Sequence, residues 1–420
     1  MANNFDSNFT RKLMMKVLDR FETNRSISKN VNTQLFKGAF NPNTGSSIDI
    51  KRPTDYASHR SATGDISSNK SDIITGKATA TVQDYITVGV DYTEAAEALE
   101  LGTDKSRLFD DIATRIVTDL ETDFAGFAMK NAGLRSGTVG TGVDSWADVA
   151  ASGALMNASG IPAGDWFYAL NPYSQVALAN EQRSLGVNPQ AGSANSKAVV
   201  AENFAGMTVK TATTLASYTT GVGADRAGTV TGTTDVTYVT AKDTMTQSIA
   251  VTAFQANLVV AAGETIAITG RNRLNLSTRQ PIVDAAGAQV VFTGTVTSAV
   301  TLNGSGAGTL VITGPAIYEA TGAYNTVDSV VTAGDIVTLG GAASTVIQPN
   351  LFWHRDAFAI ASVPIMKLHS TDTVATTKDG LQLRCSKYSN GDTNTQTVRF
   401  DLHPAYGVMN PFFAGQAFGS

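Results

Sequence analysis

A change in composition part-way along the chain is the feature that most constrains the fold. Residues 223–345 are rich in Thr, Val, Gly and Ala, carry few charges and contain no Trp. Patterns typical of helices precede this segment, and an abrupt Pro349-Asn350-Leu351-Phe352 follows it. This arrangement indicates a β domain inserted into an α+β domain. Two distant parts of the chain must then be rejoined in one fold.

Length and composition bound the class of protein. A chain of 420 residues, 42% of them hydrophobic, predicts two to three domains with sizeable cores. The net charge of −5 argues against a dedicated nucleic-acid binder, although contact with nucleic acid on one face stays open. The single Cys385 excludes an intramolecular disulfide and a cysteine zinc site. With no apolar run of membrane length and no signal peptide, a soluble cytoplasmic product is expected.

The first half of the chain shows three patterns. Residues 1–40 are locally basic, and an amphipathic helix is expected over 11–22, packed either on a neighbouring subunit or on its own domain. Residues 41–92 read as two strands, 48–52 and 81–90, around a polar tip, which is an extended hairpin. Isolated hairpins are marginal in water, so a neighbouring copy is expected to hold it. Residues 105–131 carry an apolar stripe at helical spacing, with Asp104 as a candidate N-cap.

Shorter elements follow. Helices are expected over 146–158 and 173–183, and a buried strand over 166–170. Residues 198–203 and 207–210 are expected to complete an α+β piece. Regular short strands separated by turn residues predict a sandwich or small barrel in the insert. These strands are expected at residues 236–239, 248–251, 265–268, 290–292, 309–312 and 336–339.

No motif predicts catalysis. The four histidines, His59, His354, His369 and His403, are scattered and form no metal-binding pair with another His or Cys. The glycine-rich runs lack the Lys and Ser/Thr of a phosphate loop, and no Gly-x-Ser-x-Gly elbow occurs. The sequence therefore predicts no catalytic residue, no cofactor and no metal, and a protein that is not an enzyme.

Two polar groups in the insert stand out. Arg271, Arg273 and Arg279 form a basic cluster without the aromatic interleaving of a nucleic-acid surface. Internal hydrogen bonds or an ion pair with a neighbouring subunit explain the cluster better. Lys242 and Asp243 lie at a predicted hairpin tip, 241–244, and are candidates to pair across a subunit boundary. The plain alternative for that tip is a solvated turn.

The order of elements and several local sequences resemble one family. The sequences are IVTDLET at 116–122, GDIS at 64–67, ITGKAT at 74–79, QPNLFW at 348–353, KLHS at 367–370 and RFDLHPAY at 399–406. The chain resembles the major capsid (coat) protein of short-tailed double-stranded-DNA phages of enteric bacteria. The resemblance covers nearly the whole chain and is weakest in the insert.

The resemblance implies an α+β tailed-phage capsid fold with an inserted all-β barrel. It implies a structural protein that self-assembles into hexamers and pentamers of an icosahedral shell around packaged double-stranded DNA. A scaffolding protein, a portal protein and non-specific contact with DNA are the implied partners, with no membrane. The implied location is the virion, after assembly in the host cytoplasm. The expected domains are an N-terminal arm (1–40), an extended loop (41–92), a peripheral domain with a spine helix (93–142), an axial domain (143–222), the insert (223–345) and a returning axial/peripheral segment (346–420).

Site residues follow from this reading. Candidates for subunit interfaces are Lys51, Arg52, Arg60, Lys70, Lys77, Lys242 and Asp243. Candidates that face the interior, toward scaffold or DNA, are Arg11, Lys12 and Lys16. The alternatives are a β-rich phage decoration or adhesin protein, and an enzyme with an inserted lid domain. The long helix and the returning segment argue against the former, and the lack of a catalytic set argues against the latter.

Overall fold

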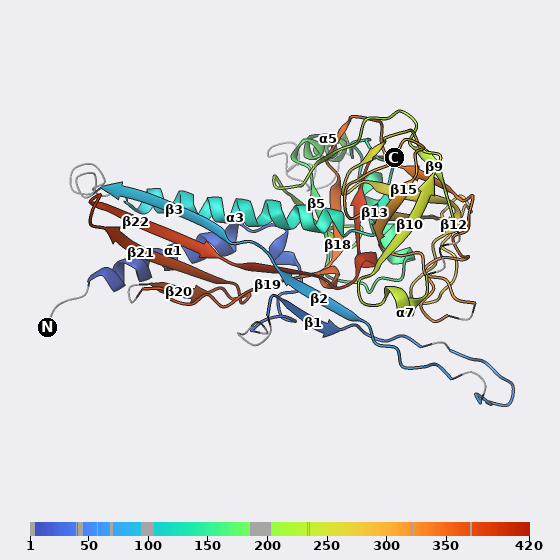
Figure 1. The fold of residues 1–420 in the computed structure, drawn as a ribbon, viewed down its shortest axis with the longest axis horizontal. Helices are drawn as coiled ribbons and strands as arrows, with labels where there is room; N and C mark the ends of the chain where they lie inside the picture. Colours follow the sequence, from blue (N-terminus) through green and yellow to red (C-terminus); the bar gives the residue numbers. More distant parts are fainter. Residues whose placement is uncertain are drawn as a thin grey trace. The chain divides into compact units, whose positions relative to one another are not determined.

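The computed structural model describes residues 5–38, 40, 45–56, 58–67, 70–93, 105–184, 203–232, 234, 236–320, 322–369 and 372–420 (Figure 1). The side chains of residues 5–10, 12, 105–110 and 182–184 lie outside this description. The chain divides into two compact units. The first comprises Met1–Asp49, Thr79–Ala125 and Phe358–Gly407, and the second comprises Ile50–Ala78, Gly126–Ala357 and Val408–Ser420.

The first unit packs its N-terminal helix onto its own sheet. Helix α1 (Phe5–Asn24) is longer than the predicted 11–22, and it buries Leu13, Met14, Val17 and Phe21. It contacts two strands of a sheet in the same unit. Of the two expected arrangements, packing on a neighbouring subunit or on its own domain, the structure therefore shows the second. A 3-10 turn, η1 (Ser28–Asn30), follows it. The order of that sheet is β20 (Thr373–Thr376), β21 (Gln382–Asn390), β22 (Thr395–Leu402) and β3 (Ile86–Thr93).

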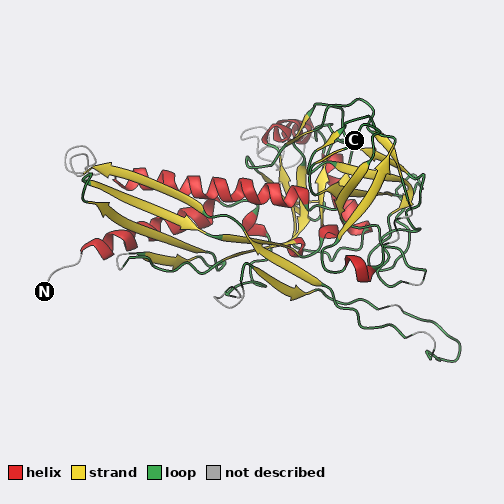
Figure 2. Ribbon diagram, viewed as in Figure 1, coloured by secondary structure: helices red, strands yellow, loops and turns green. Residues whose placement is uncertain are grey.

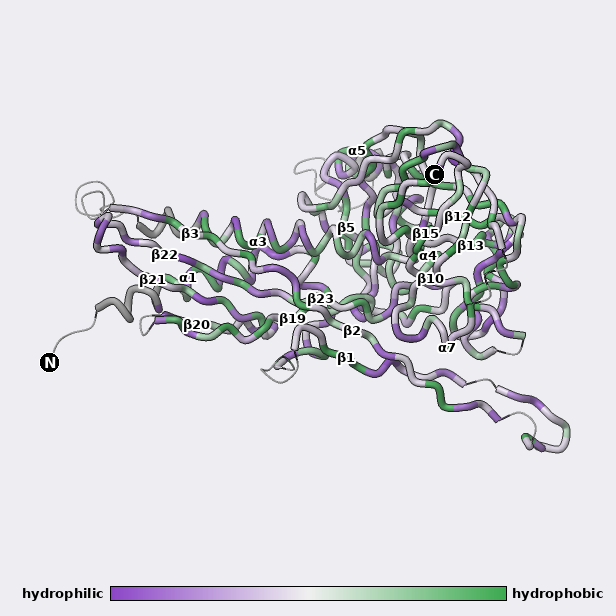
Figure 3. The backbone as a smooth tube through the Cα atoms, viewed as in Figure 1, coloured by the Kyte–Doolittle hydropathy of each residue, from purple (hydrophilic) through white to green (hydrophobic). Residues whose placement is uncertain are grey.

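The expected long helix is α3 (Lys105–Lys130). The predicted stripe is buried at Ile116, Leu120 and Phe124, which are each 0% exposed, whereas Phe127 is only partly buried. The side chain of Leu108, also predicted to lie on the stripe, is outside the described residues. In Figure 3 the colour along this helix changes repeatedly between hydrophilic and hydrophobic, as expected for an amphipathic helix. The Phe124 ring meets the ring of Tyr406 edge-on, with 5.2 Å between centroids. The predicted cap Asp104 lies outside the described residues.

The extended hairpin is built differently from the prediction. The expected strand 81–90 is two strands, β2 (Lys77–Val82) and β3, because the chain breaks at 83–85, where the Gln83 amide bonds to the Pro404 carbonyl at 2.9 Å. Strand β1 (Ser47–Lys51) therefore neighbours β2. The sheet order is β1, β2, β23 (Pro404–Val408) and β19 (Phe358–Ser362).

The main sheet of the second unit rejoins the chain on either side of the insert. Its order is β4 (Leu134–Ser136), β24 (Ala414–Ala417), β18 (Asn350–His354), β5 (Trp166–Leu170), β7 (Met207–Thr211) and β6 (Asn203–Phe204). Strands β5 and β18 pair antiparallel, with Phe352 opposite Tyr168. Helix α4 (Trp146–Ala158) begins with a capping box between Ser145 and Asp148. Helix α5 (Pro172–Ser184) and the 3-10 turns η2 (Arg355–Ala357) and η3 (Pro411–Phe413) complete this part.

The inserted segment contains a closed barrel. Its strand order is β10 (Thr246–Thr252), β15 (Gly308–Thr313), β13 (Val291–Val296), β12 (Thr265–Asn272), β16 (Ile336–Leu339) and β9 (Ala227–Val230). Alternate residues of β10 point inward, so Ile249 and Val251 are buried. Figure 2 shows these strands joined by long loops. The predicted fold class, α+β with an all-β barrel, is confirmed.

Two short ladders accompany the barrel. Strands β11 (Val259–Val260) and β14 (Val300–Thr301) pair beside it. Strands β8 (Tyr218–Thr219) and β17 (Val346–Ile347) pair where the chain enters and leaves the insert, with Thr219 opposite Val346. We call this second ladder the neck.

One strand prediction in the insert is wrong. Residues 236–239 were expected as a strand, but Tyr238–Ala241 form a short helix, α7, whose Lys242 amide donates to the Tyr238 carbonyl at 2.8 Å. Packing decides this, because the Tyr238 ring stacks on the Tyr324 ring and is 3% exposed. Lys242 and Asp243 therefore follow a helix and do not form a hairpin tip. Of the predicted segment 198–203, residues 198–202 lie outside the described residues.

Candidate assembly surfaces

The segment between β1 and β2, residues 52–76, is the part of the predicted loop 41–92 that we call the extended loop from here on, and most of its described residues are exposed (Figure 1). Residues 52–55 are its first leg and residues 74–77 its second leg. Three large apolar side chains on the extended loop are exposed: Tyr56 at 53%, Ile66 at 54% and Ile73 at 76%. The predicted interface residues Lys51, Arg60, Lys70 and Lys77 are exposed as well. Three large apolar side chains exposed on one short segment make this loop the candidate assembly surface.

Arg52 differs from the other predicted interface residues, because it is 6% exposed. Its guanidinium donates to the carbonyls of Lys77 at 2.9 Å, Val408 at 3.2 Å and Met409. Burial lowers the pKa of Arg52 to about 10, and the nearby Tyr238 and Asp243 partly offset that effect. Arg52 therefore ties the first leg of the loop to the second leg and to the C-terminal segment.

The insert contacts the base of the loop. The Asp55 amide donates to the Tyr324 hydroxyl at 2.8 Å, and the Asp55 carboxylate pairs with Arg279 at 2.6 Å. The Tyr324 ring lies parallel to the Tyr238 ring, with 3.6 Å between centroids. Ile74, on the second leg, packs against the same cluster of apolar side chains.

Lys242 and Asp243 lie beside this base. Their side chains form an ion pair with each other at 2.9 Å and are 24% and 40% exposed. The pKa of Asp243 is lowered first by its hydrogen bond with Lys242, and further by Lys77. A side chain at Gly76 would overlap the backbone oxygen of Lys242, so glycine permits the loop to approach this closely.

The three arginines of the insert have three separate sets of partners. Arg271 binds Asp335 at 2.6 Å within the barrel. Arg273 is buried, and its guanidinium carbon lies 5.3 Å from the centre of the Phe292 ring and 5.9 Å from that of the Phe412 ring. It donates to the carbonyls of Gly133 and Thr293. Burial lowers the pKa of Arg273 to about 10. Arg279 serves the base of the loop, so these residues do not form one surface.

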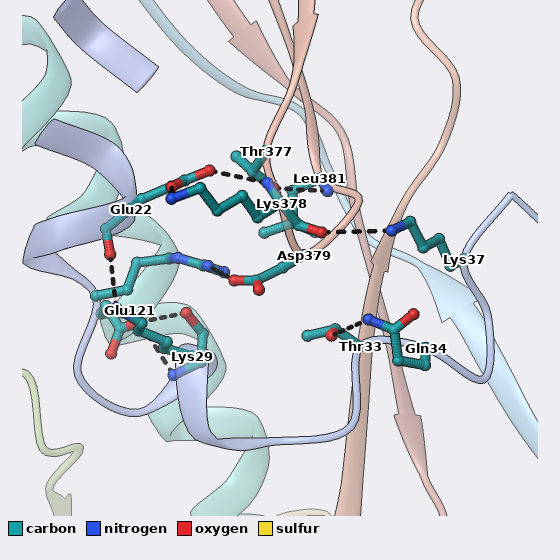
Figure 4. A network of polar contacts seen from close by, with 12 residues as sticks. Glu22, Lys29, Thr33, Gln34, Lys37, Glu121, Thr377, Lys378, Asp379 and Leu381 are labelled. Carbon is teal, nitrogen blue, oxygen red and sulfur yellow. Dashed lines mark hydrogen bonds and ion pairs between the residues drawn. The ribbon is translucent and has the colours of Figure 1, made fainter. Parts of the chain in front are cut away.

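The predicted N-terminal cations lie on α1, where Arg11 and Lys16 are exposed. The Lys12 side chain is outside the described residues. The C-terminal end of α1 is anchored by polar contacts. In one of them the Lys378 amide donates to the Glu22 carboxylate at 2.8 Å (Figure 4). Glu121 of α3 is 1% exposed and accepts from the Ile27 amide at 2.6 Å and the Ser28 amide at 3.0 Å.

A second buried carboxylate lies near the neck. Glu264 is 0% exposed, pairs with Arg226, and accepts from the amides of Ala261 at 3.0 Å and Gly221 at 3.3 Å. Burial raises the pKa of Glu264, against the lowering effect of these donors. The contacts join the start of the insert to its body.

Two kinds of site are lacking among the described residues. No group of His, Cys, Asp or Glu side chains in that part of the chain could hold a metal ion. None of the helices described there combines the length and apolar character needed to cross a membrane.

Comparison with known sequences decides the family. The family described as "P22 coat protein - gene protein 5" matches residues 1–419. The chain belongs to the P22 coat protein family. It is accordingly a major capsid protein of a phage, and its role in the virion is structural.

A full-length sequence relative supports membership in the P22 coat protein family. The "Major capsid protein" of Acyrthosiphon pisum secondary endosymbiont phage 1 is 36% identical over 425 residues, which cover 100% of both chains. Among solved structures, a chain of Mycobacterium phage Che8 has a TM-score of 0.48 at 11% identity and covers 94% of this chain and 92% of its own. The capsid of cyanophage P-SCSP1u has a TM-score of 0.41 at 10% identity and covers 90% and 84%. Membership rests on the sequence matches.

The sequence analysis did not identify several residues whose contacts hold the described surfaces of this P22 coat protein family member in place. Glu121 gave a usable signal, because it is a carboxylate beside Leu120 on the apolar stripe of α3. Tyr324 and Asp55 gave none, since their contact joins residues 269 positions apart.

Proposed function

We propose that the chain self-assembles into hexamers and pentamers of an icosahedral shell that encloses packaged double-stranded DNA. Family membership over residues 1–419 carries this proposal. The exposed extended loop supports it, because Tyr56, Ile66 and Ile73 have a use once a neighbouring subunit covers them. Many weak contacts of this kind suffice, since closure of a shell multiplies them.

The finer assignments are proposals too. Arg60 and Lys70 of the extended loop, together with Lys51 at the end of β1 and Lys77 at the start of β2, would contact neighbouring subunits. Arg52 would act as the anchor that holds the loop. Lys242 and Asp243 would bridge adjacent capsomers.

Arg11, Lys12 and Lys16 would face the interior and contact scaffolding protein or DNA. The local positive charge of these three residues, in a chain of net charge −5, supports the interior assignment.

A portal ring would replace one pentamer, and assembly would take place in the host cytoplasm.

We also propose the following domain boundaries: N-terminal arm 1–40, extended-loop hairpin 41–92, peripheral domain 93–142, first part of the axial domain 143–222, insert 223–345 and returning axial/peripheral segment 346–420. The barrel strands, which run from Ala227 to Leu339, and the neck pair at Thr219 and Val346 support the limits given for the insert. A β-rich decoration or adhesin protein is not favoured, because the family match spans the whole chain.

The test is assembly of the purified full-length chain, followed by sedimentation velocity and negative-stain microscopy. Closed shells are expected, and the Asp243→Ala variant should give fewer shells that dissociate at lower salt. A chain that stays monomeric, or that forms elongated trimers, would contradict the proposal. For the interior cations, Arg11→Ala with Lys16→Ala should reduce scaffold incorporation, whereas Arg115→Ala, an exposed cation on α3, should not.

A further inference from the structure

We propose that the inserted barrel domain sets the direction of the extended loop and thereby positions it for assembly. The inference rests on the proposed function, because an assembling subunit needs its loop to leave in one direction. Its basis is that residues of the insert hold both legs of the loop at its base. The legs are residues 52–55 and 74–77, and every contact lies within the second unit.

The first leg is held at Asp55 by two bonds. Its amide donates to the Tyr324 hydroxyl at 2.8 Å, and its carboxylate accepts from Arg279 Nη2 at 2.6 Å. Arg279 is itself oriented, because its Nη1 donates to the Asn325 carbonyl at 2.9 Å. A backbone group and a side chain of one residue are thus fixed to neighbouring residues of the insert.

The same tyrosine reaches the second leg. The Tyr324 hydroxyl donates to the Ile74 carbonyl at 3.4 Å. A phenol has one donor and can also accept, so this hydroxyl uses both capacities, one on each leg. The Ile74 side chain adds apolar contact with a cluster that contains Tyr238, Met245 and Ile317.

The ring of Tyr324 is packed against another aromatic ring of the insert. Its ring stacks on Tyr238 at 3.6 Å with 3° between the planes. Tyr238 is 3% exposed, and its amide donates to Glu319 at 3.2 Å. The stack on the buried Tyr238 restrains the Tyr324 ring and thereby fixes the position of its hydroxyl between the two legs.

A further contact ties the loop to the segment 238–245. Gly76 approaches the backbone of Lys242 so closely that a side chain there would overlap it. The neighbouring Asp243 is the residue proposed to bridge capsomers. The segment 238–245 of the insert therefore contacts the base of the loop and also contains a residue proposed to contact a neighbouring subunit. A neighbour that binds at Asp243 would restrain the loop as well.

The experiment measures hydrogen exchange on the unassembled full-length subunit, in peptides that cover residues 50–56 and 73–78. Tyr324→Phe removes only the hydroxyl, and Arg279→Gln removes the ion pair. Each should speed exchange at the base of the loop by about five- to tenfold, since each removes one bond of ordinary strength. Arg271→Gln is the matched control, because it breaks an ion pair of the same length, 2.6 Å, inside the barrel. It should leave these peptides unchanged.

Assembly is then followed by light scattering with the same proteins. The two loop-base variants should form shells several-fold more slowly than the wild type and Arg271→Gln. Unchanged exchange in both loop-base variants, or equal acceleration by Arg271→Gln, would overturn the inference. Normal assembly of variants whose loop base does exchange faster would also overturn it. Failure of the wild type to form shells would instead refute the proposed function, while the exchange result would still stand.

Discussion

Replacement of Glu121 by Gln is expected to loosen the N-terminal segment from α3. The carboxylate is 1% exposed and accepts from the amides of Ile27 and Ser28 at 2.6 and 3.0 Å. The hydroxyls of Ser26 and Ser28 are further donors. One oxygen serves Ser28 and the other serves Ile27 and Ser26. Gln keeps the shape but turns one of these oxygens into an NH2 group, which confronts donors.

The magnitude follows from these bonds. A hydrogen bond to a charged acceptor contributes about 1.5–3 kcal/mol, and a buried donor without a partner costs about 1–3 kcal/mol. Loss of one oxygen of Glu121 should therefore lower the free energy of unfolding by about 3 kcal/mol, and Glu121→Ala by about 4–5 kcal/mol. Local opening at residues 26–28 should become roughly a hundredfold more frequent in Glu121→Gln.

Urea unfolding of the unassembled subunit measures the first quantity, and hydrogen exchange at the Ile27 and Ser28 amides measures the second. Asp119→Asn is the matched control, since Asp119 lies on the same helix with its side chain 39% exposed and forms an i,i+4 pair with Arg115 at 3.2 Å. Such pairs contribute about 0.3–0.5 kcal/mol. If Glu121→Gln costs no more than Asp119→Asn, the reasoning about the buried carboxylate is refuted.

Three further predictions concern buried groups. Arg226→Met leaves the Glu264 carboxylate buried without its cation and should cost about 3–5 kcal/mol in urea unfolding. Adding Glu264→Gln should restore most of that loss, because the double variant leaves no unpaired charge in the buried site; an additive double variant would contradict this. The pKa of Asp148 is lowered because hydrogen bonds, the first from Ser420, outweigh the opposing effect of burial. Its contribution to stability is thus present above the unfolded pKa near 4 and lost as pH falls through the lower folded pKa, so Asp148→Asn should show a flatter decline of stability below about pH 4. Burial and two nearby carboxylates raise the pKa of Cys385 to about 12, so iodoacetamide at neutral pH should label it only as fast as the subunit unfolds, and immediate labelling of native protein would count against its burial.

Elements with strong local periodicity were predictable from the sequence. The stripe that includes Ile116, Leu120 and Phe124 requires only a 3.6-residue period, and α4 begins where Ser145 and Asp148 form a capping box. The alternation along β10 likewise needs no knowledge of distant residues.

Features that depend on contacts between residues far apart in the sequence could not be predicted. Residues 236–239 have the composition of a strand, but stacking of Tyr238 on Tyr324 selects a helical turn there. Arg52 looks like another surface cation of the loop until its three carbonyl partners are known. The three arginines of the insert are close in sequence, yet each finds a partner elsewhere in the second unit.

The neck between β8 and β17 bears on the order in which the chain can fold. The Asn171 amide bonds to Asn350 across 179 positions of sequence, and a sheet closed over so long a span forms slowly. Thr220 and Thr345, 125 positions apart, meet at the neck. A barrel that forms early removes most of the span from the search, because it delivers the two flanking strands side by side. Loosening the barrel should therefore slow refolding of the main sheet, although the β5 and β18 strands themselves are unchanged.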